Sequence, residues 1–452
     1  TIFEKADEVG GTWRDNTYPG LHCDIPSRYY TYSFRPNPEW SHLLPPGPEI
    51  QQYFRQVATE RDLRRHIRFG TDVVDASYRD GRWWLTTSAG VEAFDVLITA
   101  TGVLRIPRYP DIPGLDTFDG PMFHTSRWDH SVSLPDKRIG LIGTGSTGVQ
   151  ITAELGGKVE ELKVFQRTAQ WICPWPNPAV SARTKAALRR SPLLNRFGYW
   201  FWGNFVRLMF GVAPVRPGWQ RRLYQAQCRW NLRLSVRDRD LKEKLTPKDQ
   251  PMCKRMIFAG HYYRAVQEPG VAIITDGIDH IEPRGIVTVD GTLHEVDLLV
   301  LATGFDAHAY TRPLAVTGEN GYTLEEAWAD GPTAYRSVAV PGFPNMFMLM
   351  GPHSPIGNNS LIHIAEDQTN YVMWWIDQLR AGRIVSASPT EAATKVYNDD
   401  MKAAMPQTIW VTGCSSWYLG KDGLPELFPW PPERYSELLR APQVTDFDVR
   451  TG

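Results

Sequence analysis

The stretch IGLIGTGSTGVQ, from Ile139 to Gln150, carries the clearest pattern in the chain. Four residues typical of a buried strand lead into glycines with G-x-G-x-x-G spacing. Such a loop lets the backbone turn tightly against a pyrophosphate and presents the N-terminus of a helix to it. An ordinary glycine turn is the alternative, because the motif alone is weak. The pattern predicts a dinucleotide-binding loop made of Gly143, Thr144, Gly145, Ser146, Thr147 and Gly148.

The strand after this loop indicates which nucleotide is bound. Leu162 to Phe165 is apolar and leads into Arg167 and Thr168, roughly 20 residues past the glycines, where an NAD site usually carries an acid for the ribose 2′-hydroxyl. Here the charge is positive. A guanidinium matches a 2′-phosphate in charge and in geometry, so the sequence favours NADPH over NADH.

Length and composition restrict the class of protein. A chain of 452 residues with 42% hydrophobic content can form two or three domains. Its net charge of −1, without a basic run interleaved with aromatics, gives no reason to expect nucleic acid as a partner. The residues given contain no signal-peptide pattern and no apolar run of transmembrane length, so we expect no integral membrane segment. A cytoplasmic location is therefore the expectation, and the oligomeric state is not readable.

The cysteines are odd in number and scattered, without C-x-x-C spacing. This pattern indicates neither a disulfide framework nor a zinc site, and no other metal site is predicted. The five are Cys23, Cys173, Cys228, Cys253 and Cys414.

A repeat indicates how the chain is divided. Asp95 to Gly102, DVLITATG, returns as DLLVLATG at Asp297 to Gly304. Each copy is an apolar strand ending in a small-residue turn, which predicts two related nucleotide-binding units; two unrelated buried strands are the alternative. We expect an α/β fold with two Rossmann-like dinucleotide-binding domains. The first unit would comprise residues 1–135 and 301–452, and the second, for NADPH, residues 136–300, with a helical insertion at about 180–245.

The aromatic stretch Phe197 to Pro214 lies in that insertion. It is crowded with Phe and Trp but broken by Asn204 and Arg207. A buried helical face is the simplest interpretation; the lining of an apolar substrate tunnel and contact with a membrane surface are the alternatives.

The N-terminal segment adds a second set of nucleotide features. Thr1 to Glu4 resembles a strand that ends in an acid, and such an acid commonly binds an adenosine ribose. Gly10 to Asp24, GGTWRDNTYPGLHCD, suits a loop that folds over a flat ring system, although turn chemistry alone also explains its glycines and proline.

Two of these motifs resemble those of the flavin-dependent Baeyer-Villiger monooxygenases. The family fingerprint F-x-G-x-x-x-H-x-x-x-W-[P/D] is matched by Phe118, Gly120, His124, Trp128 and Asp129. The family pattern G-G-x-W-x-x-x-x-Y-P-G-x-x-x-D is matched within Gly10 to Asp24. The family's first strand and FAD-binding glycine loop should precede Thr1, so the resemblance implies an N-terminally incomplete chain.

The resemblance implies an enzyme that uses FAD, NADPH and O2. It would insert one oxygen atom next to the carbonyl of a small-molecule ketone substrate through a C4a-peroxyflavin, giving an ester or lactone. The family's catalytic cation corresponds to Arg255, and the carboxylate that orients it corresponds to Asp24. An arginine keeps its charge at working pH and can stabilise an oxyanion without acting as an acid.

Further contacts are implied by the same resemblance. Lys254 would join Arg167 and Thr168 at the 2′-phosphate, and Arg255 would also contact cofactor. Trp13 is predicted to stack near the flavin or to fill core. The FAD contacts would be Glu4, Thr12, Trp13, Asp24, Tyr30 and Val73.

Three alternatives stay open at this stage. His124 is a hydrogen-bonding hinge between units or a satisfied core histidine, rather than an acid-base group. Oxygenation at sulfur or nitrogen is the first alternative activity, and a non-catalytic NADPH-binding protein is the second. The substrate pocket is expected to draw on the helical insertion, Phe305 to Tyr310 and Cys414 to Tyr418, and to suit a bulky apolar ketone.

Overall fold

The computed structural model describes residues 1–452. Its largest sheet contains the strand that leads into the glycine motif. This sheet has the order β12-β9-β8-β16-β7 and every neighbouring pair in it is parallel. Strand β16, which lies between β8 and β7, is buried throughout, as expected when helices and loops cover both faces of a parallel sheet. The strands are β7 (Met122–His124), β8 (Arg138–Ile142), β9 (Glu161–Phe165), β12 (Val271–Ile274) and β16 (Leu298–Leu301).

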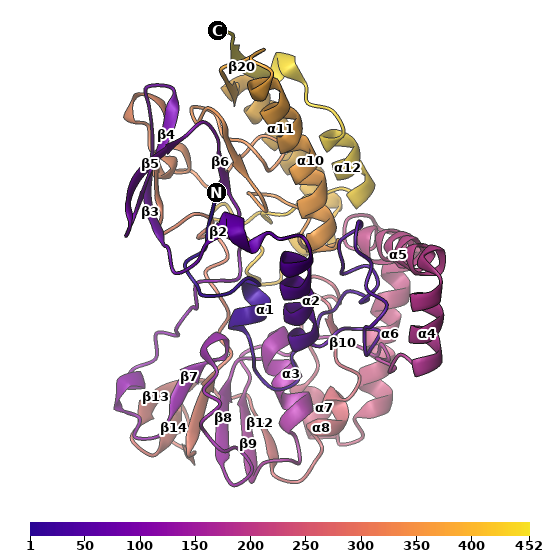
Figure 1. Cartoon of the computed structure of the whole chain (residues 1–452). Coiled ribbons are helices and arrows are strands. Elements are labelled where there is room, and N and C mark those ends of the chain that lie inside the picture. The colour runs from indigo at the N-terminus through magenta and orange to yellow at the C-terminus, as the bar shows by residue number, and fades with distance from the viewer.

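The glycine motif joins β8 to helix α3 (Ser146–Leu155), and the predicted strand at 162–165 is β9. The predicted strand–loop–helix order is thus confirmed. Strands β13 (Ile278–Glu282), β14 (Gly285–Thr288) and β15 (Leu293–Glu295) form an antiparallel meander beside this sheet (Figure 1).

The other part of the molecule combines the two ends of the chain. Strand β1 (Ile2–Phe3) pairs in parallel with β2 (Ile67–Arg68), and β6 (Leu97–Thr99) pairs in parallel with β18 (Met346–Met348). The first copy of the repeat therefore contains β6 and the second contains β16, each a short parallel strand. Figure 1 shows early and late segments of the chain together in the upper half.

A four-stranded sheet and long helices complete this part. The sheet has the order β17-β3-β4-β5, and α2 is an amphipathic helix that buries Ile50, Tyr53 and Val57. These elements are β3 (Val73–Arg79), β4 (Arg82–Thr87), β5 (Gly90–Phe94), β17 (Ala315–Thr317), α2 (Gly47–Glu60), α10 (Leu361–Arg380), α11 (Glu391–Ala404) and α12 (Pro432–Leu439).

Two connecting segments run side by side between the two parts. Arg108 N–H donates to the Gly304 carbonyl at 2.9 Å, and Asp306 N–H donates to the Ile106 carbonyl at 2.9 Å. The segments that follow Ile106 and Gly304 are therefore hydrogen-bonded neighbours. Strand β7 lies in the large sheet although it precedes residue 136, where we predicted the second unit to begin. The unit boundaries themselves stay a prediction.

The insertion is helical, as predicted. It comprises α4 (Ala182–Arg190), α5 (Pro192–Val206), a π-helical turn (Arg207–Gly211), α6 (Trp219–Ser235) and α7 (Arg239–Lys244). The interpretation of its aromatic stretch as a buried face holds for only half of it. Phe210 stacks on Trp175 and Tyr224, but Phe197, Trp200 and Phe201 are exposed.

The expectation of no disulfide is wrong. Cys253 and Cys414 form a disulfide with Cα atoms 6.1 Å apart, and 161 residues separate them in the sequence. Spacing rules detect only local cysteine patterns, so a bond between such distant segments gives no sequence signal. The other three cysteines are free and buried.

Candidate functional site

The Arg255 guanidinium is held by groups from two distant segments. Its Nε and Nη2 donate to the two carboxylate oxygens of Asp24 at 2.8 and 2.9 Å, and its Nη1 donates to the Ile356 carbonyl at 2.8 Å. A fork-to-fork pair of this kind fixes both the position and the plane of the guanidinium. The contact implied for these two residues is therefore present in the structure.

Arg255 keeps hydrogen-bonding capacity after these contacts are made. A guanidinium carries five N–H groups, and three are used here, so one on Nη1 and one on Nη2 remain. The side chain is 30% exposed. Burial disfavours its charged form, but the charge and hydrogen bonds of Asp24, together with the nearby Tyr418 and Cys23, raise the pKa of Arg255 above its ordinary value. The site thus holds a permanent cation with two N–H groups that neither Asp24 nor the Ile356 carbonyl uses, and the buried Tyr418 hydroxyl is their neighbour.

The loop at Gly10 to Asp24 reaches across to the large sheet and its helix. The Tyr18 hydroxyl donates to Gln150 Oε1 at 2.9 Å, and Gln150 Nε2 donates to the His22 carbonyl at 3.0 Å. His22 Nε2 lies 2.9 Å from the Phe258 carbonyl. Gln150 lies on α3, directly after the glycine loop, so Asp24 is fixed relative to both predicted nucleotide sites.

The glycine loop has the geometry that a pyrophosphate requires. A Cβ at Gly148 would lie 2.1 Å from the Gly143 carbonyl oxygen, whereas a Cβ at Gly145 would meet nothing within 4 Å. Gly143 itself has a φ of +110°. Helix α3 starts at Ser146, and no side chain caps its N-terminus, so its first backbone N–H groups are free. The loop therefore fits the pyrophosphate of a dinucleotide.

Side chains beside this loop fit a 2′-phosphate. Lys254 Nζ lies 3.3 Å from Thr168 Oγ1 and 2.8 Å from Asp249, and the Thr144 hydroxyl donates to the Thr168 carbonyl at 2.8 Å. Arg167 and Thr168 are exposed at the end of β9. The structure thus brings together the three residues predicted to bind the 2′-phosphate.

The residues predicted to contact FAD lie around β1 and the following loop. The Glu4 carboxylate accepts the Ala6 N–H at 2.9 Å and lies 3.2 Å from Arg14. The buried Thr99 hydroxyl, at the end of β6, has no hydrogen-bond partner. A carboxylate on a strand end and an unpaired hydroxyl on another are groups that fit a flavin nucleotide's ribose and phosphates.

Four other predicted FAD contacts are distributed over this region, and two of them pack against each other. Trp13 donates its indole N–H to the Tyr30 hydroxyl at 3.1 Å and meets that ring edge-on, so the structure packs it against Tyr30. Thr12 begins the short helix α1 (Thr12–Asp15), and Val73 begins β3.

The fingerprint forms the edge of the large sheet. His124 ends β7 and is fully buried; its Nε2 lies 3.0 Å from the Gly304 carbonyl, and its Nδ1 accepts the Ser126 N–H at 3.2 Å. These partners require the neutral form with the proton on Nε2, and burial lowers the pKa of His124. Because Gly304 starts the connecting segment, His124 is a satisfied buried histidine at the junction of the two parts.

The other fingerprint residues support this edge. Trp128 is buried with its ring edge-on to Phe123, and Phe118 packs below Gly120, where a Cβ would lie 2.7 Å from the Asp297 carbonyl oxygen. Asp129 is bonded only to Ser131, whose hydroxyl and N–H lower the pKa of that carboxyl.

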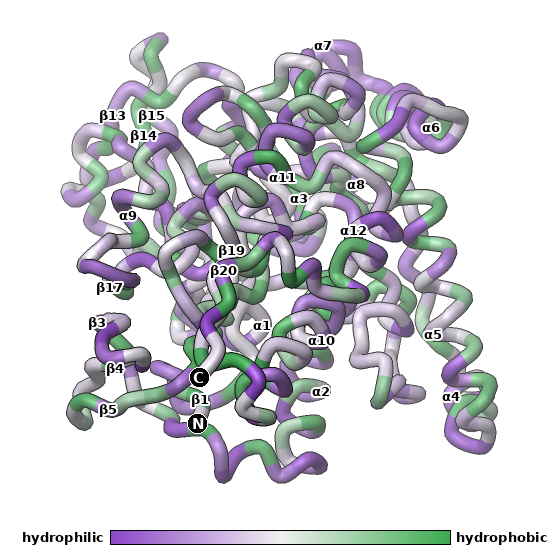
Figure 2. Tube along the Cα trace, turned by 90° about the horizontal axis from the view of Figure 1, so that it is seen from above, coloured by the Kyte–Doolittle hydropathy of each residue, from purple (hydrophilic) through white to green (hydrophobic).

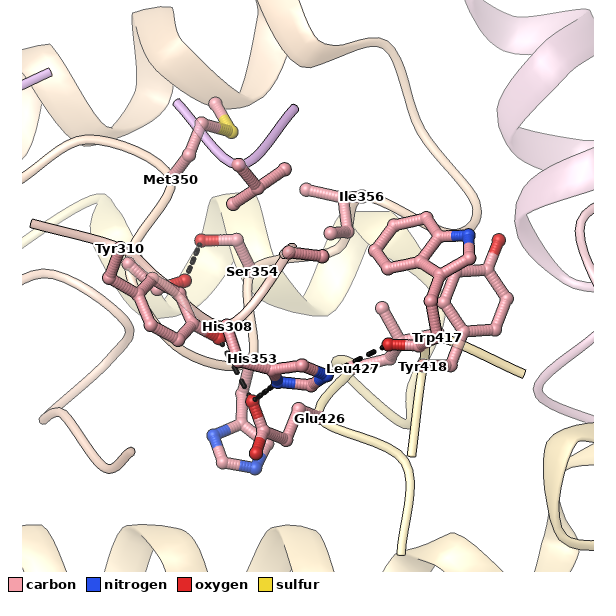
Figure 3. Close-up of a pocket in the computed structure, with 13 residues that line it drawn as sticks. His308, Tyr310, Met350, His353, Ser354, Ile356, Trp417, Tyr418, Glu426 and Leu427 are labelled. Carbon is pink, nitrogen blue, oxygen red and sulfur yellow. Dashed lines mark hydrogen bonds and ion pairs between the residues drawn. The ribbon is translucent and has the colours of Figure 1, made fainter. Parts of the chain in front are cut away.

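Ile356, whose carbonyl holds Arg255, also lines a small pocket. Two of the three segments predicted to form the substrate pocket line it, those at 305–310 and 414–418; the helical insertion does not. Figure 3 shows its polar centre, where both ring nitrogens of His308 face acceptors: Glu426 at 2.6 Å and the Trp417 carbonyl at 2.9 Å. Tyr310 donates to the same carboxylate at 3.2 Å.

This polar centre was not found from the sequence. Two acceptors facing one imidazole favour its doubly protonated form, and Glu426 raises the pKa of His308. His353, also in the pocket, is fully enclosed, and burial lowers its pKa to about 4. His308 and Glu426 are 118 residues apart, and neither belongs to a motif, so no sequence signal marks them.

Known proteins are similar to this chain over most of its length. The family model for flavin-binding monooxygenase-like proteins matches residues 1–176. An uncharacterised monooxygenase of Mycobacterium tuberculosis is 51% identical over 99% of this chain and 90% of its own length. A Baeyer-Villiger monooxygenase of Streptomyces coelicolor is 37% identical over 93% of this chain and 82% of its own.

Solved structures agree with the sequence relatives. Cyclohexanone monooxygenase from Rhodococcus sp. Phi1, bound to NADP+, superimposes with a TM-score of 0.89 at 29% identity, covering 100% of this chain and 94% of that one. An oxidised steroid monooxygenase bound to NADP gives a TM-score of 0.87 at 30% identity, with the same coverage. With the glycine loop and the paired arginine already placed, these similarities show that the chain belongs to the flavin-dependent Baeyer-Villiger monooxygenases.

Proposed function

We propose that this FAD- and NADPH-dependent monooxygenase inserts oxygen beside the carbonyl of a bulky apolar ketone, and that Arg255 is its catalytic cation. The observation that carries this proposal is the guanidinium fixed by Asp24 and the Ile356 carbonyl, with two N–H groups that these partners leave unused. FAD, when bound and reduced by NADPH, supplies the activation of O2.

The residues of the chain have separable roles in this proposal. Gly143 to Gly148 would hold the NADPH pyrophosphate, and Arg167, Thr168 and Lys254 its 2′-phosphate. Glu4, Thr12, Trp13, Tyr30 and Val73 would lie along FAD. The FAD unit would comprise residues 1–135 and 301–452, and the NADPH unit residues 136–300. A cytoplasmic location is part of the proposal, because the reaction consumes NADPH.

Arg255 would act on the substrate carbonyl. As oxygen adds to a ketone, negative charge develops on the carbonyl oxygen, and a fixed cation with free N–H groups stabilises that charge without reorganising. Asp24 would keep the guanidinium in this orientation and compensate part of its desolvation. The apolar wall around Ile356, Trp417 and Tyr418 would limit access of water.

Product analysis tests this proposal. The protein is supplied with NADPH, FAD and 18O2 and given a cyclic, a linear and an aryl ketone: cyclohexanone, 2-dodecanone and 4-phenyl-2-butanone. We expect an ester or lactone that carries one labelled oxygen atom from at least one ketone. Oxidation of NADPH without any such product, together with sulfoxide formation from thioanisole, would favour heteroatom oxygenation. A flavin-free protein that still binds NADPH would favour a binding protein.

A further inference from the structure

The outer face of helix α5 carries large apolar side chains that no other part of the chain covers. Leu193, Phe197, Trp200 and Phe201 fall at i, i+4, i+7 and i+8, so they form one stripe along the helix, the α5 stripe. Leu193 is 79% exposed, Phe197 56% and Trp200 59%. The aromatic members contact each other, with ring centroids 5.7 Å and 6.3 Å apart.

The opposite face of α5 is the one that packs on the protein. Gly203 lies against the Tyr29 ring, Val206 is fully buried, and Asn195 Nδ2 donates to the Pro36 carbonyl at 2.9 Å. The helix is thus already anchored, and the exposure of its stripe is not the result of a detached helix. Figures 1 and 2 place α4 and α5 at the margin of the molecule, with hydrophobic and hydrophilic positions interleaved along α5.

The charge of this region differs from that of the rest of the chain. Between Ser181 and Arg237 there are twelve Lys and Arg residues and no Asp or Glu, in a chain with 49 basic and 50 acidic residues. Five of these cations adjoin the α5 stripe in sequence and form its basic flank. The basic flank comprises Arg183, Lys185, Arg189, Arg190 and Arg196.

The basic flank is free to meet an external anion. Of its members only Arg189 has a carboxylate within 4.0 Å, at 3.5 Å from Glu39. A groove lined by Phe34, Pro36, Arg196, Phe197 and Trp200 continues the apolar surface beyond the helix. Exposed Trp, Phe and Leu beside unpaired Lys and Arg are typical of helices that lie in the headgroup region of a bilayer.

We propose that the α5 stripe and its basic flank dock on the surface of a membrane that contains anionic phospholipid. The apolar side chains would enter the headgroup–acyl boundary, while the basic flank would pair with lipid phosphates. No helix of the chain is long and apolar enough to cross a bilayer, so the attachment is to the surface. A second copy of the chain is a poorer partner, since a two-fold contact through this face would oppose cation to cation. Polyanions such as nucleic acid would leave Leu193 and Phe201 uncovered.

Vesicle co-sedimentation of the full chain tests the proposal independently of catalysis. The probes are extruded vesicles of phosphatidylcholine alone and of phosphatidylcholine with 30% phosphatidylglycerol. The variants are F197S/W200S/F201S for the stripe and R183Q/R189Q/R190Q/R196Q for the flank. V289S/Y322S/V396S is the matched control, since it removes exposed apolar side chains outside the insertion. Thermal unfolding midpoints verify that every variant is folded.

We expect the unaltered chain and the control to bind the anionic vesicles at 0.1 M salt. Each of the two test variants should partition at least about tenfold more weakly, because interfacial binding needs both apolar burial and charge. Binding should also weaken at 0.5 M salt. The proposal is overturned if the unaltered chain does not bind anionic vesicles. It is also overturned if the stripe variant binds them as strongly as the unaltered chain, because charge alone would then account for the binding. It is equally overturned if sedimentation velocity shows that the stripe variant dissociates a dimer that does not bind vesicles.

Discussion

Asp24→Asn is the substitution that most sharply tests how Arg255 is oriented. Asparagine keeps the shape of the side chain and one carbonyl oxygen, so one of the two hydrogen bonds at 2.8 and 2.9 Å is retained and the counter-charge is lost. A buried hydrogen bond to a charged group contributes about 1.5–3 kcal/mol, and the lower value applies here because the two side chains are 30% and 23% exposed. If that energy is expressed in the transition state, the rate of ester formation falls by roughly tenfold.

The assay is the steady-state rate of ester formation from the panel ketone that the unaltered protein converts fastest, normalised to bound FAD. Glu268→Gln is the matched control, since it breaks an exposed arginine–carboxylate pair, Arg264 with Glu268 at 3.4 Å, that has no role in the proposed reaction. We expect kcat to fall for Asp24→Asn and to stay within about twofold for the control. An unchanged kcat in Asp24→Asn, at full FAD content, would refute the reasoning that this pair orients the guanidinium.

Two further predictions concern the glycine loop and the pocket. Gly148→Ala should lower the free energy of unfolding by about 1–3 kcal/mol, because its Cβ would lie 2.1 Å from the Gly143 carbonyl oxygen. Gly145→Ala should leave the free energy of unfolding unchanged and weaken NADP+ binding by at least about tenfold. Calorimetry that finds the two variants equally stable would contradict the first expectation. Since Glu426 raises the pKa of His308, their pairing stabilises the fold fully below pH 6.5 and is lost as the pH rises through the raised value. His308→Gln should therefore cost about 1 kcal/mol at pH 6 and less at pH 9 in urea unfolding, and an equal loss at both pH values would show that the charge is not involved.

Local patterns account for the parts of the fold that could be predicted. The glycine motif at 143–148 and the apolar stretch at 162–165 are each short local patterns. They correspond to the β8–α3 connection and to β9, as predicted. The repeated segments at 95–102 and 297–304 each contain a parallel strand for the same reason. In these cases the residues that determine the strand or turn lie within it or next to it in the sequence.

The remaining features depend on contacts between distant segments. Asp24 and Arg255 are 231 residues apart, and only the family resemblance suggested their contact. The disulfide between Cys253 and Cys414 had no resemblance or spacing to indicate it. The exposure of Trp200 could not be predicted from the sequence either. A helical period of 3.6 residues shows which side chains share a face, but it does not show whether that face is buried.

The central claim is that the Arg255 guanidinium stabilises negative charge on a ketone oxygen, and Arg255→Ala tests it most directly. The measurement is the ratio of ester formed from a ketone to sulfoxide formed from thioanisole by the same preparation, with Arg264→Ala as the exposed-arginine control. Oxidation of a sulfide develops no carbonyl oxyanion, so we predict that the ratio falls by about 10²- to 10³-fold in Arg255→Ala and is unchanged in the control. An Arg255→Ala protein that binds FAD and keeps the ratio of the unaltered protein would contradict the claim.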